Sequence, residues 1–225
     1  MDKSNSDNGR SGKIREIIEL VNKSPLSSIK QTMTEILRVI ETESSNARDL
    51  KNTIEKDPPL CAGLLKIANS SSYGYPRTIS DIQEAIICIG FDAVKELVLN
   101  QKLCELFRAG EHMNGYSRQS LWKHSAAVAV CSKMIFRREF RERGYNAYVA
   151  GLLHDIGIIV EDQLLRKEFS LALKLAAQSK NNLYCIENEV LLVNHADIGR
   201  AIAENWSFPV ELGMSIGFHH EPDLV

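Results

Sequence analysis

Residues 150–157, which read AGLLHDIG, constrain the fold of this chain more than any other stretch. An apolar run that suits an inward-facing helix ends there at an adjacent histidine and aspartate, His154 and Asp155. Burying an imidazole and a carboxylate without partners is costly, so the pair needs either a metal ion or a hydrogen-bonded polar pocket. For an isolated dipeptide, the simpler interpretation is a helix end whose polar groups are satisfied by neighbouring backbone.

The positions of the other histidines favour a shared pocket. The chain has six histidines, and five lie in helical or helix-end contexts that are compatible with one pocket: His124, His154, His195, His219 and His220. His124 lies on one apolar helix face with Leu121 and Val128, at spacings of three and four. A single imidazole on such a face is usually a core residue. Here it is one of five.

Helical periodicity extends over most of the chain, and we predict an all-α fold. Sustained alternation of apolar and polar residues, which is typical of strands, is missing from the sequence. Helices are expected at about residues 13–23, 29–40, 50–54, 58–68, 82–89, 92–107, 118–140, 145–155, 158–166, 168–179, 184–193, 195–205 and 209–219. Asn69, at the end of one of them, is expected to fix a loop between helices rather than to bind a ligand.

Two polar stretches suggest how the chain is divided. Residues 1–12 have almost no apolar content, and we predict a disordered leader there. In residues 108–117, glycine, asparagine and charged residues replace the apolar period, which is typical of a seam between two helical halves. The expected parts are therefore an N-terminal helical part at 13–110 and a second helical part, with the histidines, at 111–225.

Composition excludes several classes of function. The formal net charge is −2 with 25% charged residues, so no strong field favours nucleic acid or anionic lipid. No apolar run approaches the roughly 18 to 20 residues that cross a bilayer. Because the first residues do not form a basic and then apolar signal, we expect a cytoplasmic protein. The five cysteines show no C-x-x-C spacing, which indicates reduced thiols rather than disulfides or a thiolate zinc site.

The pattern of histidines and upstream motifs resembles a known family. It is similar to the HD superfamily of metal-dependent phosphohydrolases, and within it to the regulatory branch of HD-related output domains (HDOD) in bacterial signalling. The more specific motifs lie upstream, at residues 55–60 (EKDPPL), 64–70 (LLKIANS), 79–86 (ISDIQEAI) and 89–90 (IG). The resemblance covers roughly residues 24 to 225. It implies an HD-domain-like helical bundle preceded by a packed N-terminal helical subdomain.

The resemblance also implies a set of metal ligands. His124, His154 and Asp155 fall on the family's first ligand positions, and His195, His219 and His220 match the extra histidines of its multinuclear members. Such sites favour iron, manganese or zinc, and a bound ion lowers the pKa of a bridging water that attacks a phosphate ester. Two alternatives stay open. His124 could hydrogen-bond Asp155 across the core, and His219 and His220 could be an exposed surface pair.

Two departures from the family's pattern argue against efficient catalysis. Active multinuclear members typically carry a lysine where this chain has Ile158. The family's final aspartate ligand would follow the His-His pair, but the sequence ends at Val225, so we expect this ligand to be missing unless Asp197 or Asp223 replaces it. The HDOD branch is regarded as lacking established enzymatic activity, which agrees with both departures.

Three functional hypotheses follow. The first is a bacterial regulatory domain without efficient catalysis, which acts through contacts with signalling proteins or senses a nucleotide second messenger at the HD pocket. The second is a metal-dependent phosphohydrolase of a cyclic dinucleotide or another nucleotide. The third is a helical adaptor whose histidines never meet. Separations of more than about 10 Å between the imidazoles and the carboxylate would exclude an HD-type centre, because ligand bonds are about 2 Å long. Oligomeric state is left open by all three.

Overall fold

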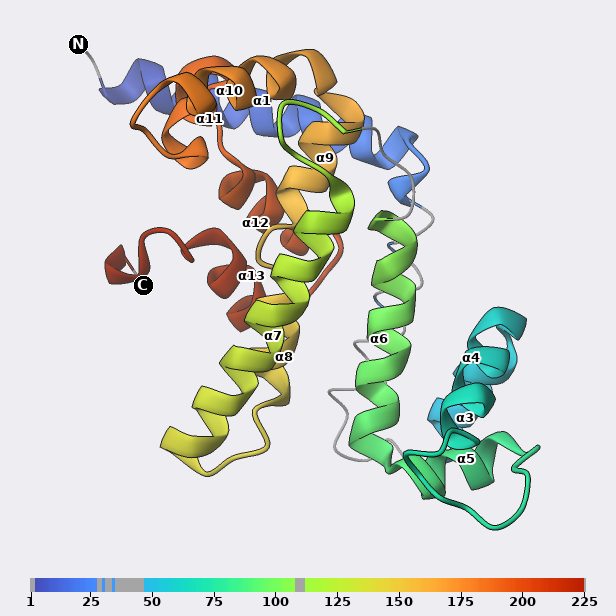
Figure 1. Cartoon of the computed structure of the whole chain (residues 1–225). Coiled ribbons are helices and arrows are strands. Elements are labelled where there is room, and N and C mark those ends of the chain that lie inside the picture. The colour runs from blue at the N-terminus through green and yellow to red at the C-terminus, as the bar shows by residue number, and fades with distance from the viewer. Residues whose placement is uncertain (1–2, 28–29, 31–33, 35–46, 108–111, 225) are drawn as a thin grey trace. The chain divides into compact units, whose positions relative to one another are not determined.

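The computed structural model describes residues 3–27, 30, 34, 47–107 and 112–224, and helices joined by turns and loops make up this part of the chain (Figure 1). The α-helices are α1 (Lys3–Lys23), α3 (Ala47–Glu55), α4 (Pro58–Ala68), α5 (Ile82–Ile89), α6 (Phe91–Phe107), α7 (Arg118–Phe140), α8 (Tyr145–Leu153), α9 (Ile156–Leu164), α10 (Arg166–Gln178), α11 (Leu183–Leu191), α12 (His195–Asn205) and α13 (Val210–Gly217), with a 3₁₀ turn at Pro222–Leu224. The predicted all-α class is confirmed. Among the described helices, none combines the length and the apolar character that crossing a membrane requires.

Most expected helices form within a few residues of their predicted bounds. The expected helix at 29–40 lies mostly outside the described residues. One difference concerns the central motif, because α9 begins at Ile156, directly after the turn at His154 and Asp155, and not at residue 158 as expected. The apolar run therefore continues through the His-Asp pair as two helices joined by a two-residue turn.

The chain forms two compact units, and their division differs from the predicted one. The first unit comprises Met1–Ser28 and Phe107–Val225, and the second comprises Ile29–Leu106. Helix α1 thus belongs with the C-terminal half rather than with the N-terminal part. The reason is burial, because Ile17 and Val21 of α1 are fully enclosed where the helix packs on α9 and α12.

The start of α1 also differs from the prediction of a disordered leader over residues 1–12. The helix begins at Lys3, so residues 3–12 are helical. Composition could not show that this polar segment has a distant partner. Arg10 donates a hydrogen bond from Nε to the Asp197 carboxylate at 3.0 Å, which gives the start of α1 a contact with α12.

The second unit is held by caps and by one bridging asparagine. Asp57 accepts a hydrogen bond from the backbone N–H of Leu60 and caps α4, with Pro58 in the first turn, where its missing N–H costs nothing. The Asn69 amide donates to the carbonyls of Leu65 and Ile79, both at 2.8 Å, and its side-chain oxygen accepts from the Ile79 N–H. The expected role of Asn69, fixing the loop between helices, agrees with these bonds.

Close helix contacts in the first unit set the geometry around the histidines. Helices α7 and α8 form an antiparallel pair (Figure 1). Their backbones approach so closely at Gly151 that a Cβ there would lie 2.8 Å from the Cα of Ala129. This approach brings the middle of α7 against the end of α8, so that His124 and His154 can meet.

A buried ion pair fixes the start of α7 to α9. The Arg118 guanidinium donates from Nε to the Asp162 carboxylate, and both side chains are nearly inaccessible to solvent. The Tyr116 hydroxyl donates to the same carboxylate at 3.4 Å, and Arg166 lies 3.6 Å from its other oxygen. The network ties the helix that carries His124 to the helix that follows Asp155.

We expect the Asp162→Asn variant to lose about 3 kcal/mol of unfolding free energy, because the buried Arg118 charge would lose its counter-charge. Denaturant titration followed by circular dichroism measures the loss. The matched control is Glu139→Gln, which removes the partner of an exposed pair with Arg138 and should change stability by less than about 0.5 kcal/mol. Equal midpoints for the two variants would contradict the role given to the buried pair.

Candidate metal centre

His154 and Asp155 occupy the turn between α8 and α9, and the backbone orients the histidine. The Nδ1 atom of His154 lies 2.8 Å from the carbonyl oxygen of Gly151. A carbonyl oxygen can only accept, so Nδ1 carries the proton and Nε2 presents a lone pair. The Asp155 side chain is 10% exposed, and its two oxygens face different sets of imidazoles.

The first set, called here the His154 group, consists of His124, His154 and Asp155. The Nε2 atoms of the two histidines are 3.2 Å apart. Oδ2 of Asp155 lies 3.1 Å from Nε2 of His154 and 3.6 Å from Nε2 of His124. The latter distance is too long for the hydrogen bond that was an alternative role for His124. The His124 side chain is 56% exposed, so this side of the cluster is open to solvent.

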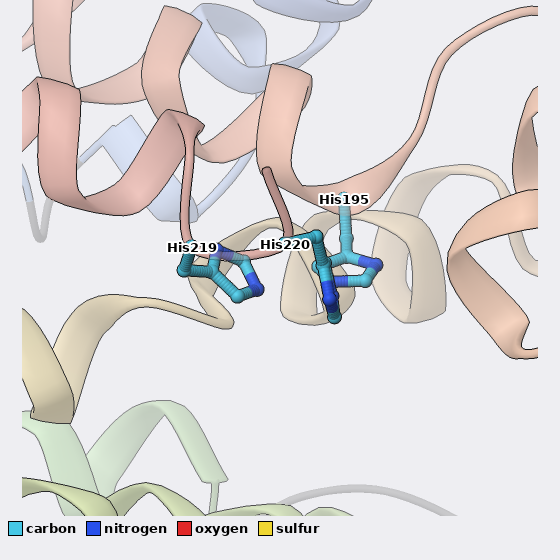
Figure 2. A group of neighbouring side chains, drawn as sticks. All are labelled: His195, His219 and His220. Atoms are coloured by element: carbon cyan, nitrogen blue, oxygen red, sulfur yellow. The ribbon is translucent and has the colours of Figure 1, made fainter. Parts of the chain in front are cut away.

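The second set, called here the His195 group, consists of His195, His219 and His220 (Figure 2). His195 is the first residue of α12, and the other two follow α13. The Nε2 atoms of His195 and His220 are 2.9 Å apart, and the rings of His219 and His220 lie 4.1 Å apart between centroids. The two C-terminal histidines therefore face His195, and they do not form the isolated surface pair that was an alternative.

Asp155 connects the two groups. Its Oδ1 atom lies 3.5 Å from Nε2 of His195 and 3.5 Å from Nε2 of His219, while Oδ2 faces the His154 group. A carboxylate in this position can contribute one oxygen to each of two cations. All six residues predicted as ligands are thus brought into one cluster, which excludes an adaptor whose histidines never meet.

The cluster fits divalent cations. His154 and His219 both direct Nδ1 at a carbonyl, of Gly151 and Ile216, so that their Nε2 lone pairs face the Asp155 carboxylate. Lone pairs and a carboxylate repel one another unless a cation lies between them. The buried Nε2 of His219 has no hydrogen-bond partner among the described residues.

The spacing of the donor atoms and their chemical type agree with metal binding. Neighbouring donor atoms are 2.9 to 3.6 Å apart. Bonds of about 2.1 Å around an octahedral or tetrahedral ion place neighbouring ligand atoms about 3.0 to 3.4 Å apart. Imidazole nitrogens combined with a carboxylate suit iron, manganese or zinc.

Electrostatics keeps two of these groups in the protonation states that a metal requires. Burial alone would raise the pKa of Asp155, but favourable interactions with His154 and His219, when these rings are protonated in the absence of a cation, outweigh it and hold the pKa well below its usual range. Burial, together with the neighbouring His219 and His195, lowers the pKa of His220 to about 4. At neutral pH the carboxylate is therefore ionised and the His220 ring is neutral, as cation binding needs.

Two buried glutamates behind His195 were not found from the sequence. Oε2 of Glu187 accepts from the His195 backbone N–H at 2.9 Å and lies 2.6 Å from its Nδ1, which fixes the orientation of the ring. Glu161 is fully buried, and burial together with the charge of Glu187 raises its pKa well above the usual value. A detectable signal was present, because both glutamates interrupt apolar helix faces where charged residues are rare.

Ile158, at the position where active members of the family carry a lysine, is buried in α9. The two aspartates considered for the family's final ligand position have other surroundings. Asp197 accepts hydrogen bonds from Asn194 and Arg10, and Asp223 is exposed in the 3₁₀ turn. Neither aspartate belongs to the His/Asp groups in the described part of the chain.

Comparisons with known proteins bear on the family and the fold. The sequence model of the HDOD domain family matches residues 26–222. The fold resembles an HDOD domain protein of unknown function from Geobacter sulfurreducens, at 29% identity and a TM-score of 0.81 over 97% of this chain and 72% of that one.

Two further solved structures share the fold. One, from Marinobacter aquaeolei VT8, is provisionally named a signal transduction protein (24% identity, TM-score 0.77, 98% of this chain and 51% of that one). The other, from Shewanella amazonensis SB2B, is provisionally named a phosphohydrolase (20% identity, TM-score 0.71, 95% and 73%). The chain spans only 37% and 42% of the length of two curated relatives that it matches.

Proposed function

Since the chain belongs to the HDOD domain family, we propose that it is a bacterial signal-transduction domain that binds divalent cations at the six-residue centre without efficient hydrolysis. The domain acts through contact with signalling proteins or senses a nucleotide second messenger at that centre. The observation that carries the proposal is the convergence of imidazole Nε2 atoms on both oxygens of Asp155.

The residues of the centre have different roles. Asp155 directs one oxygen at each ligand group, and Glu187 and the carbonyls of Gly151 and Ile216 orient the imidazoles. Bound cations supply positive charge that attracts a phosphate and lowers the pKa of water. The exposed His124 side leaves an approach for an anionic ligand. A buried Ile158, in place of a lysine that contacts substrate phosphate, supports weak turnover.

A metal-dependent phosphohydrolase of a cyclic dinucleotide or another nucleotide is the second candidate. The arrangement of the cluster favours it, because a carboxylate between two imidazole groups could bridge the two cations of a two-metal hydrolysis site. The two candidates share the cation site and differ in turnover.

Elemental analysis followed by a hydrolysis assay separates the two candidates. Protein purified without added metal should contain about two iron, manganese or zinc ions per chain. With bis(p-nitrophenyl) phosphate and Mn²⁺, its turnover should not exceed that of the His154→Ala variant. Turnover at least tenfold above that variant would support the hydrolase instead. A metal-free protein that takes up no added cation would contradict both. His112→Ala, which alters the histidine outside the cluster, is the control for metal content.

A further inference from the structure

Helix α1 contributes to the metal centre's surroundings although it lies before the matched family region. The family match begins at residue 26, whereas α1 covers Lys3–Lys23. Its Ile17 and Val21 are fully buried, and the helix packs on α9 and α12. One of these helices directly follows Asp155, and the other begins with His195. A segment outside the matched region therefore contacts two of the helices that surround the centre.

One side chain of α1 reaches the cap that positions His195. Arg10 donates from Nε to Oδ2 of Asp197 at 3.0 Å. The same oxygen accepts from the Asn194 N–H at 3.2 Å, and the Asp197 N–H donates back to the Asn194 side chain at 2.9 Å. These bonds form a capping box around the first turn of α12, and His195 lies inside it. Arg10 thus stabilises the backbone from which the imidazole projects.

The Arg10 guanidinium also interacts electrostatically with Tyr184 and Glu221, which lie beside His220 or follow it in the chain. The Tyr184 ring packs on the His220 ring, with 4.6 Å between centroids, and the Tyr184 hydroxyl lies beside the carboxylate of Glu221. Burial alone would lower the pKa of Arg10, but Asp197, with Tyr184 and Glu221, raises it. The Arg10 charge therefore pairs directly with Asp197 and interacts more weakly with two groups near His220.

We propose that Arg10 is a positioning residue for the His195 group, so that docking of α1 sets the cation affinity of this group and not that of the His154 group. The inference rests on the proposed function, since it requires that the centre binds cations. Arg10 does not touch the cation. The Arg10 and Asp197 side chains are 44% and 23% exposed, so the contact is accessible to a competing charged group. Displacement of Arg10 then lowers the occupancy of one group alone.

Cation titration of variants of the whole 225-residue chain tests the proposal. Binding of Mn²⁺ and Zn²⁺ to metal-free protein is measured by competition with a chromophoric chelator, and the visible absorption of bound Co²⁺ reports each site's geometry. Arg10→Ala should lower the affinity for one of the two ions about tenfold, as the loss of an outer-shell partner does. The affinity for the other ion should stay within twofold of the wild-type value. Arg10→Lys should recover most of the affinity. Asp197→Asn keeps an acceptor for the cap but loses the charge, so it should match Arg10→Ala, and the double variant should add little.

The control and the contrary outcomes are distinct. Arg15→Ala removes an exposed arginine from the same helix and should bind both ions like the wild type. If the wild type binds two ions and Arg10→Ala binds them equally well, the positioning role is overturned while the proposed function stands. An equal loss of affinity for both ions, with a lower melting temperature, would indicate general destabilisation and would also overturn the positioning role. A wild type that binds no ion would overturn the proposed function itself.

Discussion

The Gly157→Ala variant is expected to lose about 3 kcal/mol or more of unfolding free energy, together with its ability to retain metal. A Cβ at this position would lie 1.9 Å from the carbonyl oxygen of His195 and 2.7 Å from its carbonyl carbon. Both are backbone atoms, so no side-chain rotation can relieve the overlap. Helix α12 would have to move away from α9 and carry the His195 imidazole with it.

Chemical denaturation and elemental analysis of the purified variant measure the two losses. Gly12→Ala is the matched control, because a Cβ on this exposed glycine of α1 would meet no atom within 4 Å. The control should gain about 0.5 to 1 kcal/mol, since alanine favours a helix over glycine. A Gly157→Ala protein with wild-type stability and metal content would show that the contact between α9 and α12 is looser than described here.

The Asp155→Ala variant should lose both cations, whereas His220→Ala should lose one. Asp155 is the residue whose two oxygens face the two ligand groups, while His220 belongs to one of them. The dissociation constants of both ions should rise more than about 100-fold in Asp155→Ala, because even outer-shell partners are worth 10- to 100-fold.

Elemental analysis after dialysis gives the expected order of wild type, then His220→Ala, then Asp155→Ala. His112→Ala should retain the wild-type content, since this histidine lies outside both groups. Retention of one ion by Asp155→Ala would mean that the carboxylate serves a single group and does not bridge two.

Local signals in the sequence account for most helices but not for the grouping of α1. Periodicity predicted both ends of α7, and Asp57 with Pro58 predicted the start of α4. The contact between Arg10 and Asp197 joins residues 187 positions apart, and neither residue carries a local pattern that indicates the other. Residues 3–12 therefore read as a polar leader although they form part of a helix.

The candidate centre was predicted by residue identity, but its internal arrangement was not. Helix-end positions and the family resemblance selected His124, His195 and the His-Asp pair. The division into two groups depends on which oxygen of Asp155 faces which imidazole, and that depends on the crossing of α9 and α12. Sequence spacing does not indicate the role of Glu187, because its partner His195 lies across a helix boundary, eight residues away.

The two-residue junction between α8 and α9 has a mechanical consequence. His154 caps the end of α8 and Asp155 caps the start of α9, so two consecutive residues with donor atoms belong to different helices. A cation bound by both side chains would therefore resist any change in the angle between α8 and α9. Binding or release of the cation would then alter the stiffness of this turn without cleavage of any substrate bond.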